Sequence, residues 1–209
     1  ARAGRGPAGG GSGREAPRLS RIFTVGHSDH REDAFFALLA RHRVRDVVDV
    51  RSVPSSKMFP QFKERALAES CKRRGISYRH CPELGNKVGG IAFLLQQPEG
   101  QAALAALAAS ADFERANTEG ATAYMCAEAY WRSCHRQVIA QRLAEDFGVL
   151  TTHILRDGTT EVHPAGHLLP SRYGLPAAAA SPGAACACCP TDGPAQAQGA
   201  EAPAPAPGR

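Results

Sequence analysis

The stretch Arg21–Ser52, RIFTVGHSDHREDAFFALLARHRVRDVVDVRS, joins two short apolar runs through an amphipathic segment. The first run, RIFTVGHS, is rich in β-branched and apolar residues and predicts a strand. The middle segment predicts a helix, because five of its side chains fall on one helical face: Ala34, Phe35, Leu38, Leu39 and His42. The valines of VRDVVDV (44–50) are too continuous for a half-exposed strand and indicate a strand buried on both faces. The stretch therefore predicts a strand–helix–strand unit of an α/β domain.

The same alternation continues along the chain. Further strands are predicted at ISYRH (76–80), ATAYMC (121–126) and VLTTHIL (149–155). Further helices are predicted up to Arg74, where Gly75 ends the helix, over 99–116, and over 133–147, where Gly148 does the same. Asp157-Gly158 lies between β-prone stretches and predicts a hairpin with an antiparallel edge strand. We therefore expect a three-layer, Rossmann-like α/β domain with a mainly parallel five-stranded sheet plus a C-terminal hairpin strand.

Two of the predicted helices carry capping signals at their starts. Asp29 with Glu32 three residues later is the predicted cap-and-return pair of the first helix. Ser133 is the predicted N-cap of the helix over 133–147, which would place the next three residues, CHR, in its first turn.

The two ends of the chain differ in composition from its centre. Residues 1–20 are rich in Gly and Arg, and residues 174–209 are rich in Ala, Pro and Gly. Such segments bury too little apolar surface to offset their ordering entropy, so we expect disordered tails around a single domain at 21–173. The CACC run at 186–189 falls in the second tail, where soft-metal binding or acylation is an alternative hypothesis.

Charge and cysteine usage limit the class of protein. The net charge of +5 permits phosphate contacts but lacks the concentrated basic stripe of a dedicated nucleic-acid binder. No apolar run approaches the roughly 18 residues that span a bilayer, which predicts no membrane span. Cys71, Cys81, Cys126 and Cys134 lie in ordinary globular sequence and are expected to be reduced thiols in the cytoplasm. A remnant of an Arg-rich organelle transit peptide is the alternative explanation of the N-terminal segment.

Polar side chains follow several strands of the predicted sheet. His27 and Ser28 follow the first strand, and Asp49 to Ser52 end the second. Tyr78 to His80 end the third strand, and Cys126 to Glu128 end the fourth. Each residue alone has a structural explanation, such as a core histidine, a helix cap or an Asp–Arg pair. Because ligands of parallel sheets bind beyond the carboxyl ends of the strands, their coincidence at one edge predicts a site.

The segment YMCAEAYWRSCHR (124–136) strengthens this prediction. A helix N-terminus that carries Arg136 is a candidate anion site and would lower the pKa of Cys134. Glu128 offers a competing explanation, because it could pair with Arg136 or His135 and neutralise the turn.

This segment has two further chemical interpretations. Cys126 to Ser133 has the C-x5-R-S spacing of cysteine-dependent phosphatases, but the bulky and acidic residues inside it do not suit a phosphate cradle. Cys126 and Cys134 with His135, and with His27 or His80, are the ligands of the alternative zinc hypothesis, although C-x7-C-H is not a standard zinc interval.

The motifs TVGHSDH, VVDVRSVPSS, YRHCPELGN, CAEAYWRSCHR and THILRDGTTEVHP, taken in this order, resemble the domain of unknown function 488 (DUF488) family. The resemblance extends from about Ile22 to His163 and implies a small α/β fold. It also implies that the polar residues of these motifs occupy the family's characteristic positions. Where family members usually continue Leu-Gly-Gly, this chain has Leu84-Gly85-Asn86.

We therefore predict an enzyme with one pocket at the carboxyl edge of the sheet, acting on a phosphorylated or other anionic small molecule, or on a nucleotide component. The candidate catalytic residues are Cys126, Glu128, Cys134 and His135. The candidate substrate-binding residues are His27, Ser28, Asp49, Arg51, His80 and Arg136. No residue is assigned as a metal ligand, and the cofactor and oligomeric state stay open. The alternatives are a non-catalytic module that binds nucleic acid or another ligand, and a Cys/His metal-binding protein.

Overall fold

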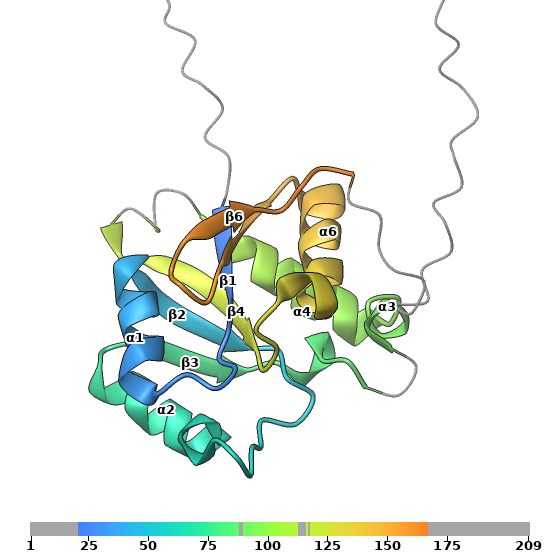
Figure 1. Cartoon of the computed structure of the whole chain (residues 1–209). Helices are drawn as coiled ribbons and strands as arrows, with labels where there is room; N and C mark the ends of the chain where they lie inside the picture. Colours follow the sequence, from blue (N-terminus) through green and yellow to red (C-terminus); the bar gives the residue numbers. More distant parts are fainter. Residues whose placement is uncertain (1–20, 88–89, 113–115, 117, 167–209) are drawn as a thin grey trace, which may run out of the picture. The chain divides into compact units, whose positions relative to one another are not determined.

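The computed structural model describes residues 21–87, 90–112, 116 and 118–166. These residues form a six-stranded sheet in the order β3-β2-β4-β1-β5-β6 (Figure 1). The strands are β1 (Arg21–Gly26), β2 (Val44–Asp49), β3 (Ser77–His80), β4 (Ala121–Cys126), β5 (Leu150–Ile154) and β6 (Thr160–Val162). All neighbours pair in parallel except β5 and β6, which are antiparallel. The prediction of an α/β domain with a mainly parallel sheet and a C-terminal hairpin strand is confirmed.

Helices connect the parallel strands. The α-helices are α1 (Glu32–Arg41), α2 (Glu64–Arg73), α3 (Gly90–Leu94), α4 (Pro98–Ala109) and α6 (Arg136–Phe147). Three short 3₁₀ turns are η1 (Pro60–Phe62), η2 (Pro82–Leu84) and η3 (Trp131–Ser133). Among the described helices, none has the length and hydropathy needed to cross a membrane.

The strand order reverses between β1 and β4. From β1 the chain moves to β2 and then to β3, and it returns to place β4 between β1 and β2 before it continues to β5. In such a sheet the connections leave the carboxyl ends of β1 and β4 in opposite directions, which opens a crevice between them.

The apolar core consists of two clusters of buried side chains. Val47 belongs to the cluster that contains Phe35 of α1 and Leu67 of α2. The next residue along β2, Val48, belongs to the cluster that contains Leu104 of α4 and Ile139 of α6. Because successive strand residues point to opposite faces, β2 is apolar on both of its faces, as its continuous valines predict.

Both predicted helix starts are wrong. The N-cap of α1 is Arg31, without a side-chain cap, while Asp29 instead contacts Arg156. Ser133 ends η3 and donates to the Tyr130 carbonyl, and α6 begins only at Arg136. Aromatic residues explain the later start of α6: the Trp131 ring is buried and stacks on His153 with centroids 4.0 Å apart, which holds the preceding residues in the η3 turn. Cys134 and His135 therefore precede the helix.

Three glycine signals are confirmed. Gly75 (φ +67°) follows α2, Gly148 (φ +64°) caps α6, and Gly158 (φ +80°) lies in the hairpin. These left-handed conformations favour glycine. No sequence pattern predicts the short helix α3, which precedes the helix predicted over 99–116. The predicted disordered tails, at 1–20 and 174–209, and the CACC run lie outside the described residues.

Candidate functional site

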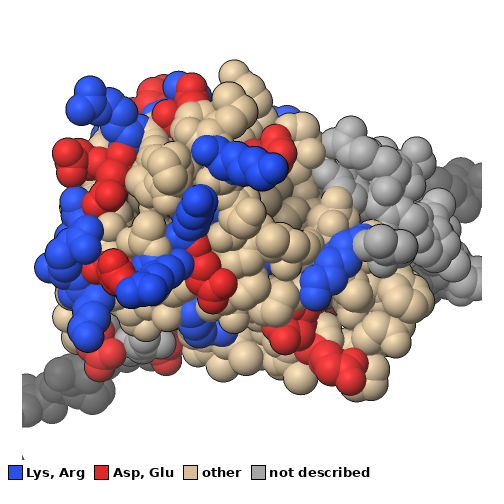
Figure 2. Space-filling model, turned by 90° about the horizontal axis from the view of Figure 1, so that it is seen from below, with Lys and Arg blue, Asp and Glu red and all other residues tan. Residues whose placement is uncertain are grey.

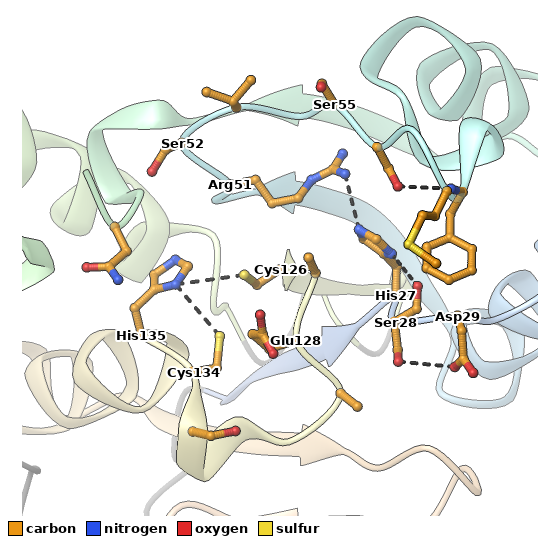
Figure 3. Close-up of a pocket in the computed structure, with 18 of the residues that line it drawn as sticks. His27, Ser28, Asp29, Arg51, Ser52, Ser55, Cys126, Glu128, Cys134 and His135 are labelled. Carbon is orange, nitrogen blue, oxygen red and sulfur yellow. Dashed lines mark hydrogen bonds between the residues drawn. The ribbon is translucent and has the colours of Figure 1, made fainter. Parts of the chain in front are cut away.

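A cavity of about 940 Å³ lies at the carboxyl edge of the sheet, at the crevice between β1 and β4. Residues that follow three neighbouring strands line it (Figure 3). They include His27 and Ser28 after β1, Arg51 and Ser52 after β2, Cys126 and Glu128 at the end of β4, and Cys134 and His135 before α6. The predicted convergence of polar residues from these strand ends on one edge is therefore present in the structure.

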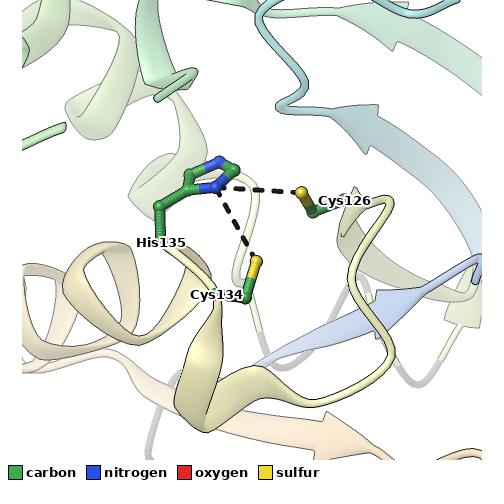
Figure 4. A group of neighbouring side chains, drawn as sticks. All are labelled: Cys126, Cys134 and His135. Carbon is green, nitrogen blue, oxygen red and sulfur yellow. Dashed lines mark hydrogen bonds between the residues drawn. The ribbon is translucent and has the colours of Figure 1, made fainter. Parts of the chain in front are cut away.

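Cys126, Cys134 and His135 form a compact cluster in the wall of this cavity (Figure 4). The Nδ1 atom of His135 lies 3.8 Å from the Cys126 Sγ and 3.7 Å from the Cys134 Sγ. All three residues are buried, with exposed fractions of 6%, 2% and 6%. We call them the Cys/His cluster. Strand β4 positions the first sulfur, and the η3 turn positions the other two residues.

The ring orientation of His135 is fixed from its other side. Its Nε2 lies 3.1 Å from the Val50 carbonyl oxygen, which can only accept a hydrogen bond. Nε2 therefore carries a hydrogen and donates it, and in the neutral ring the Nδ1 lone pair faces the two sulfurs. The end of β2 thus sets the tautomer of a residue that lies 85 positions further along the chain.

The two thiols of the cluster differ in acidity. Burial by itself would raise the pKa of Cys134, but hydrogen bonds with Cys126 and His135 and the charge of Arg136 outweigh it and hold this pKa well below its usual value. The pKa of Cys126 is raised, by its hydrogen bond with Cys134 and by burial. The thiolate of this pair therefore belongs to Cys134. Burial raises the pKa of Cys81, outside the cavity, to about 11.

Arg136 does not line the cavity, but its side chain contacts the cluster through Cys134. Its side chain is 1% exposed, and its Nε donates to the Cys134 Sγ at 3.4 Å. Its Nη2 donates to the Glu128 main-chain carbonyl at 2.6 Å, and its Nη1 to the Thr24 hydroxyl at 3.2 Å. The hypothesis that the Glu128 carboxylate neutralises Arg136 or His135 is wrong, because this side chain is exposed and forms no ion pair among the described residues. The role of Arg136 in substrate binding stays a prediction.

A second buried network occupies the β1–β2–β3 side of the cavity. Arg51 donates from Nε and Nη2 to the two carboxylate oxygens of Asp49, at 2.8 Å and 2.5 Å. Its Nη1 donates to the Phe62 carbonyl at 2.8 Å and lies 3.2 Å from the His27 Nε2. The Tyr78 hydroxyl donates to Asp49 at 2.8 Å. We call these residues, without Phe62, the Asp49–Arg51 network.

His27 is neutral in this network. Its Nδ1 donates to the Ser28 carbonyl at 2.9 Å, so its Nε2 is free to accept from Arg51. Burial, and then the charge of Arg51, lower the pKa of His27 to about 4. The ring also stacks on Phe62, with centroids 4.3 Å apart.

His80 and Arg132 lie outside the cavity lining. The His80 Nε2 donates to the Arg51 carbonyl at 2.8 Å, and both nitrogens of His27 are engaged, so neither histidine completes the zinc ligand set that the sequence suggested. The Arg132 guanidinium pairs with Glu161 and lies over the Trp131 ring, 4.3 Å from its centroid. The C-x5-R phosphatase interpretation is therefore wrong, because its arginine points away from Cys126.

Apart from Ser52, sequence reasoning missed one wall of the cavity. It is formed by residues of the β2–η1 connection and by one residue after η2: Ser52, Val53, Ser55, Ser56, Lys57, Met58, Phe59 and Asn86. The side-chain oxygen of Asn86 accepts from the Ile91 amide at 3.1 Å, at the start of α3. The length of the connection directly after Arg51 was the signal that could have indicated this wall.

The fold and cavity define an α/β protein with a cysteine–histidine site at the switch point of its sheet. The family model described as domain of unknown function DUF488 matches residues 31–143, which is more than half of the chain. The chain belongs to this family, as the order of its motifs predicts. Comparisons with curated proteins and with solved structures found no match.

Proposed function

We propose that the protein is an enzyme whose reactive centre is the Cys/His cluster, acting on a small molecule held in the cavity. The observation that carries this proposal is the burial of three donor side chains in the wall of a cavity at the switch point of the sheet. A buried cluster that only stabilised the fold would not need to line a cavity that is open to solvent. A thiolate, an imidazole and a nearby carboxylate are the groups that covalent and acid–base catalysis use.

The substrate that suits the cavity carries an anionic group, such as a phosphate. The β2–η1 wall presents three serine hydroxyls and the exposed ammonium of Lys57, all of which donate hydrogen bonds. Arg51 also lines the cavity, but its guanidinium is already neutralised by Asp49. We therefore assign the anion to the wall that contains Lys57, and the reacting bond to the opposite side, beside the cluster.

The roles within the centre follow from its contacts. Cys134 is held as the thiolate by its hydrogen bonds with Cys126 and His135 and by the charge of the Arg136 guanidinium. Glu128 lines the same cavity with its side chain exposed, so it is the candidate for proton exchange with the substrate (Figure 3). Cys126 and His135 complete the centre.

The alternative of a nucleic-acid module lacks a specific observation in its favour. The basic run CKRR (71–74) would be the docking surface of such a module. Its Arg74 instead pairs with Glu32 and Asp33, and the Arg74 guanidinium lies 4.1 Å from the centroid of the Phe36 ring. On the face shown in Figure 2, Lys and Arg side chains lie beside Asp and Glu side chains. Such mixed charge does not form the basic stripe that tracks a phosphate backbone.

The proposal includes the wider setting of the site. We place the domain at 21–173 and describe it as a three-layer, Rossmann-like arrangement, supported by the alternation of strand residues between two core clusters. We also propose a cytoplasmic location. The free thiols of Cys71, Cys81, Cys126 and Cys134 support it, because a reducing compartment preserves them.

The test is a search for turnover with the full chain. Phosphorylated metabolites and nucleotides are incubated with the protein, and products are detected by mass spectrometry. For a substrate found in this way, Cys134→Ser should lower kcat by at least about 100-fold, while Cys81→Ser, in a buried thiol outside the cavity, should retain it. Lys57→Ala should raise KM about tenfold with little change in kcat, and its control Lys63→Ala should change neither. Turnover that survives Cys134→Ser would refute the proposed centre.

A further inference from the structure

We infer that Cys126, Cys134 and His135 are the protein ligands of a Zn²⁺ ion whose fourth coordination position faces the cavity. This inference rests on the proposed function only for the statement that the cluster is the reactive centre. It adds that a zinc ion, held by these three residues, is the reactive group of that centre. Three features of the site support the zinc ion: the spacing of the donor atoms, the orientation of the imidazole, and the access from the cavity.

The spacing of the three donor atoms suits a tetrahedral ion. Zn²⁺ takes thiolate sulfur at about 2.3 Å and imidazole nitrogen at about 2.0–2.1 Å, which separates S from N by about 3.6 Å at a tetrahedral angle. The two S···N separations at His135 are 3.8 Å and 3.7 Å. All three donor atoms lie within 4.8 Å of one another. For the two S···N pairs, shifts of a few tenths of an ångström would bring the atoms to zinc distances.

The orientation of His135 also suits a metal ligand. A histidine that binds a metal usually donates its other ring hydrogen to a carboxylate or a main-chain carbonyl, which fixes the tautomer. The Nε2 of His135 has this contact with the Val50 carbonyl, so Nδ1 directs a lone pair at the sulfurs. Two sulfurs and a nitrogen lone pair then converge on one point, where they repel one another unless protons or a cation lie between them.

The charges around the cluster fit a divalent ion. Two thiolates and a neutral imidazole carry a charge of −2 that offsets Zn²⁺ itself, and the buried Arg136 guanidinium leaves a net charge of +1 that an anionic fourth ligand would neutralise. Arg136 donates to the Cys134 sulfur, a contact that supports a metal-bound thiolate from outside the coordination sphere. No carboxylate ion pair competes for this guanidinium among the described contacts.

The access to the cluster distinguishes a catalytic from a structural zinc site. Structural sites close the ion with four protein ligands, whereas catalytic sites use three, including the Cys₂His set, and leave the fourth position for water or substrate. In the described part of the chain the candidate ligand group has only three members, and each of them lines the cavity. Glu128 lies in the same lining, where its carboxylate would accept a proton from a zinc-bound water.

The competing explanation is an ion pair between a Cys134 thiolate and a His135 imidazolium, without a metal. The two explanations differ in the role of Cys126. Zinc needs both sulfurs, whereas the ion pair needs only Cys134 and His135. The Cys126→Ser variant therefore separates them, because serine keeps the size of the side chain and removes the thiolate.

The experiment measures zinc in the full chain. The protein and its variants are expressed with added zinc, checked for folding by circular dichroism, and analysed by native and denaturing mass spectrometry and by competition with a zinc chelator. We expect one zinc ion per chain under native conditions only. Three variants should each lower the zinc affinity: Cys126→Ser, Cys134→Ser and His135→Gln. The loss should exceed the roughly 10–100-fold that removal of a residue hydrogen-bonded to a ligand costs. The buried-thiol controls Cys71→Ser and Cys81→Ser should keep it.

Two results would overturn the zinc site. One is a folded wild-type chain that binds no zinc on titration with Zn²⁺, and the other is zinc affinity that survives Cys126→Ser. If zinc is absent but Cys134→Ser still abolishes turnover, the inference fails and the proposed centre stands as a thiolate enzyme. If zinc is bound but turnover does not depend on the cluster, the proposed function fails and the metal site stands.

Discussion

The cavity lies between two buried polar groups of similar size, the Asp49–Arg51 network and the Cys/His cluster. In the network, a carboxylate meets a guanidinium through two hydrogen bonds, and a tyrosine, a carbonyl and a neutral histidine satisfy the remaining groups. In the cluster, the donor atoms of Cys126, Cys134 and His135 contact mainly one another. A closed network holds strand ends in place, whereas a convergent set of electron-pair donors has capacity left for a ligand. Burial alone therefore does not distinguish structural from reactive groups.

The largest effect should come from opening the Asp49–Arg51 network. Asp49→Ala leaves the buried Arg51 guanidinium unpaired, which should lower the free energy of unfolding by about 3–5 kcal/mol in urea titrations. Asp33→Ala removes an exposed partner of Arg74 and should cost at most about 1 kcal/mol. The folded fraction of Asp49→Ala should keep its zinc. A stability change no larger than that of Asp33→Ala would show that the network is not structural.

A pH titration probes the same network through His27. The folded-state pKa of His27, about 4, lies below the ordinary histidine value of 6.5, so the unfolded chain takes up a proton first as the pH falls. The stabilising contribution is present above pH 6.5 and is lost between pH 6.5 and 4, by up to about 3 kcal/mol. His27→Gln should therefore show a flatter dependence of unfolding free energy on pH. Parallel profiles for the two proteins would contradict a neutral His27.

A substitution at the end of β1 should disturb the support of the cluster. A Cβ on Gly26 would lie 1.9 Å from the Glu128 carbonyl oxygen, which accepts from Arg136. Gly26→Ala should lower the free energy of unfolding by about 1–3 kcal/mol, measured in urea titrations. It should also lower the zinc affinity, measured by competition with a chelator. Gly148→Ala is the matched control, since it strains a positive φ at the end of α6 without touching the cluster. Equal zinc affinity in the two variants would show that the Glu128 carbonyl does not support the zinc site.

The smallest effect should come from Arg132. Its side chain is exposed and paired with Glu161, so Arg132→Ala should change stability by less than about 1 kcal/mol and leave zinc binding and turnover unchanged. Urea unfolding and the zinc assay provide the measurement. A loss of turnover comparable to that of Cys134→Ser would restore the C-x5-R phosphatase interpretation.

Much of the fold follows from local patterns in the sequence. The continuous valines of β2, the apolar face of α1 and the glycines after α2 and α6 each act within a few residues, and the structure confirms them. The helix starts near Asp29 and Ser133 could not be predicted in the same way. Contacts with Arg156 and His153, which lie far along the chain, decide them.

The site was predictable in part for the same reason. The polar residues at the strand ends lie together because parallel strands end at one edge, which topology alone implies. The sequence does not reveal which of those residues belong to the Asp49–Arg51 network and which to the Cys/His cluster. The pairing of Arg51 with Asp49 is local, but the Val50 carbonyl that orients His135 comes from another strand. The metal alternative therefore included His27 and His80, which other contacts occupy.

The central claim is that the Cys/His cluster binds a metal with an open position. X-ray absorption at the zinc edge of the zinc-loaded full chain tests it most directly, because it reports the ligand atoms themselves. The account predicts two sulfur ligands at about 2.3 Å and two nitrogen or oxygen ligands at about 2.0 Å. A first shell without sulfur, or with four sulfurs, would contradict it.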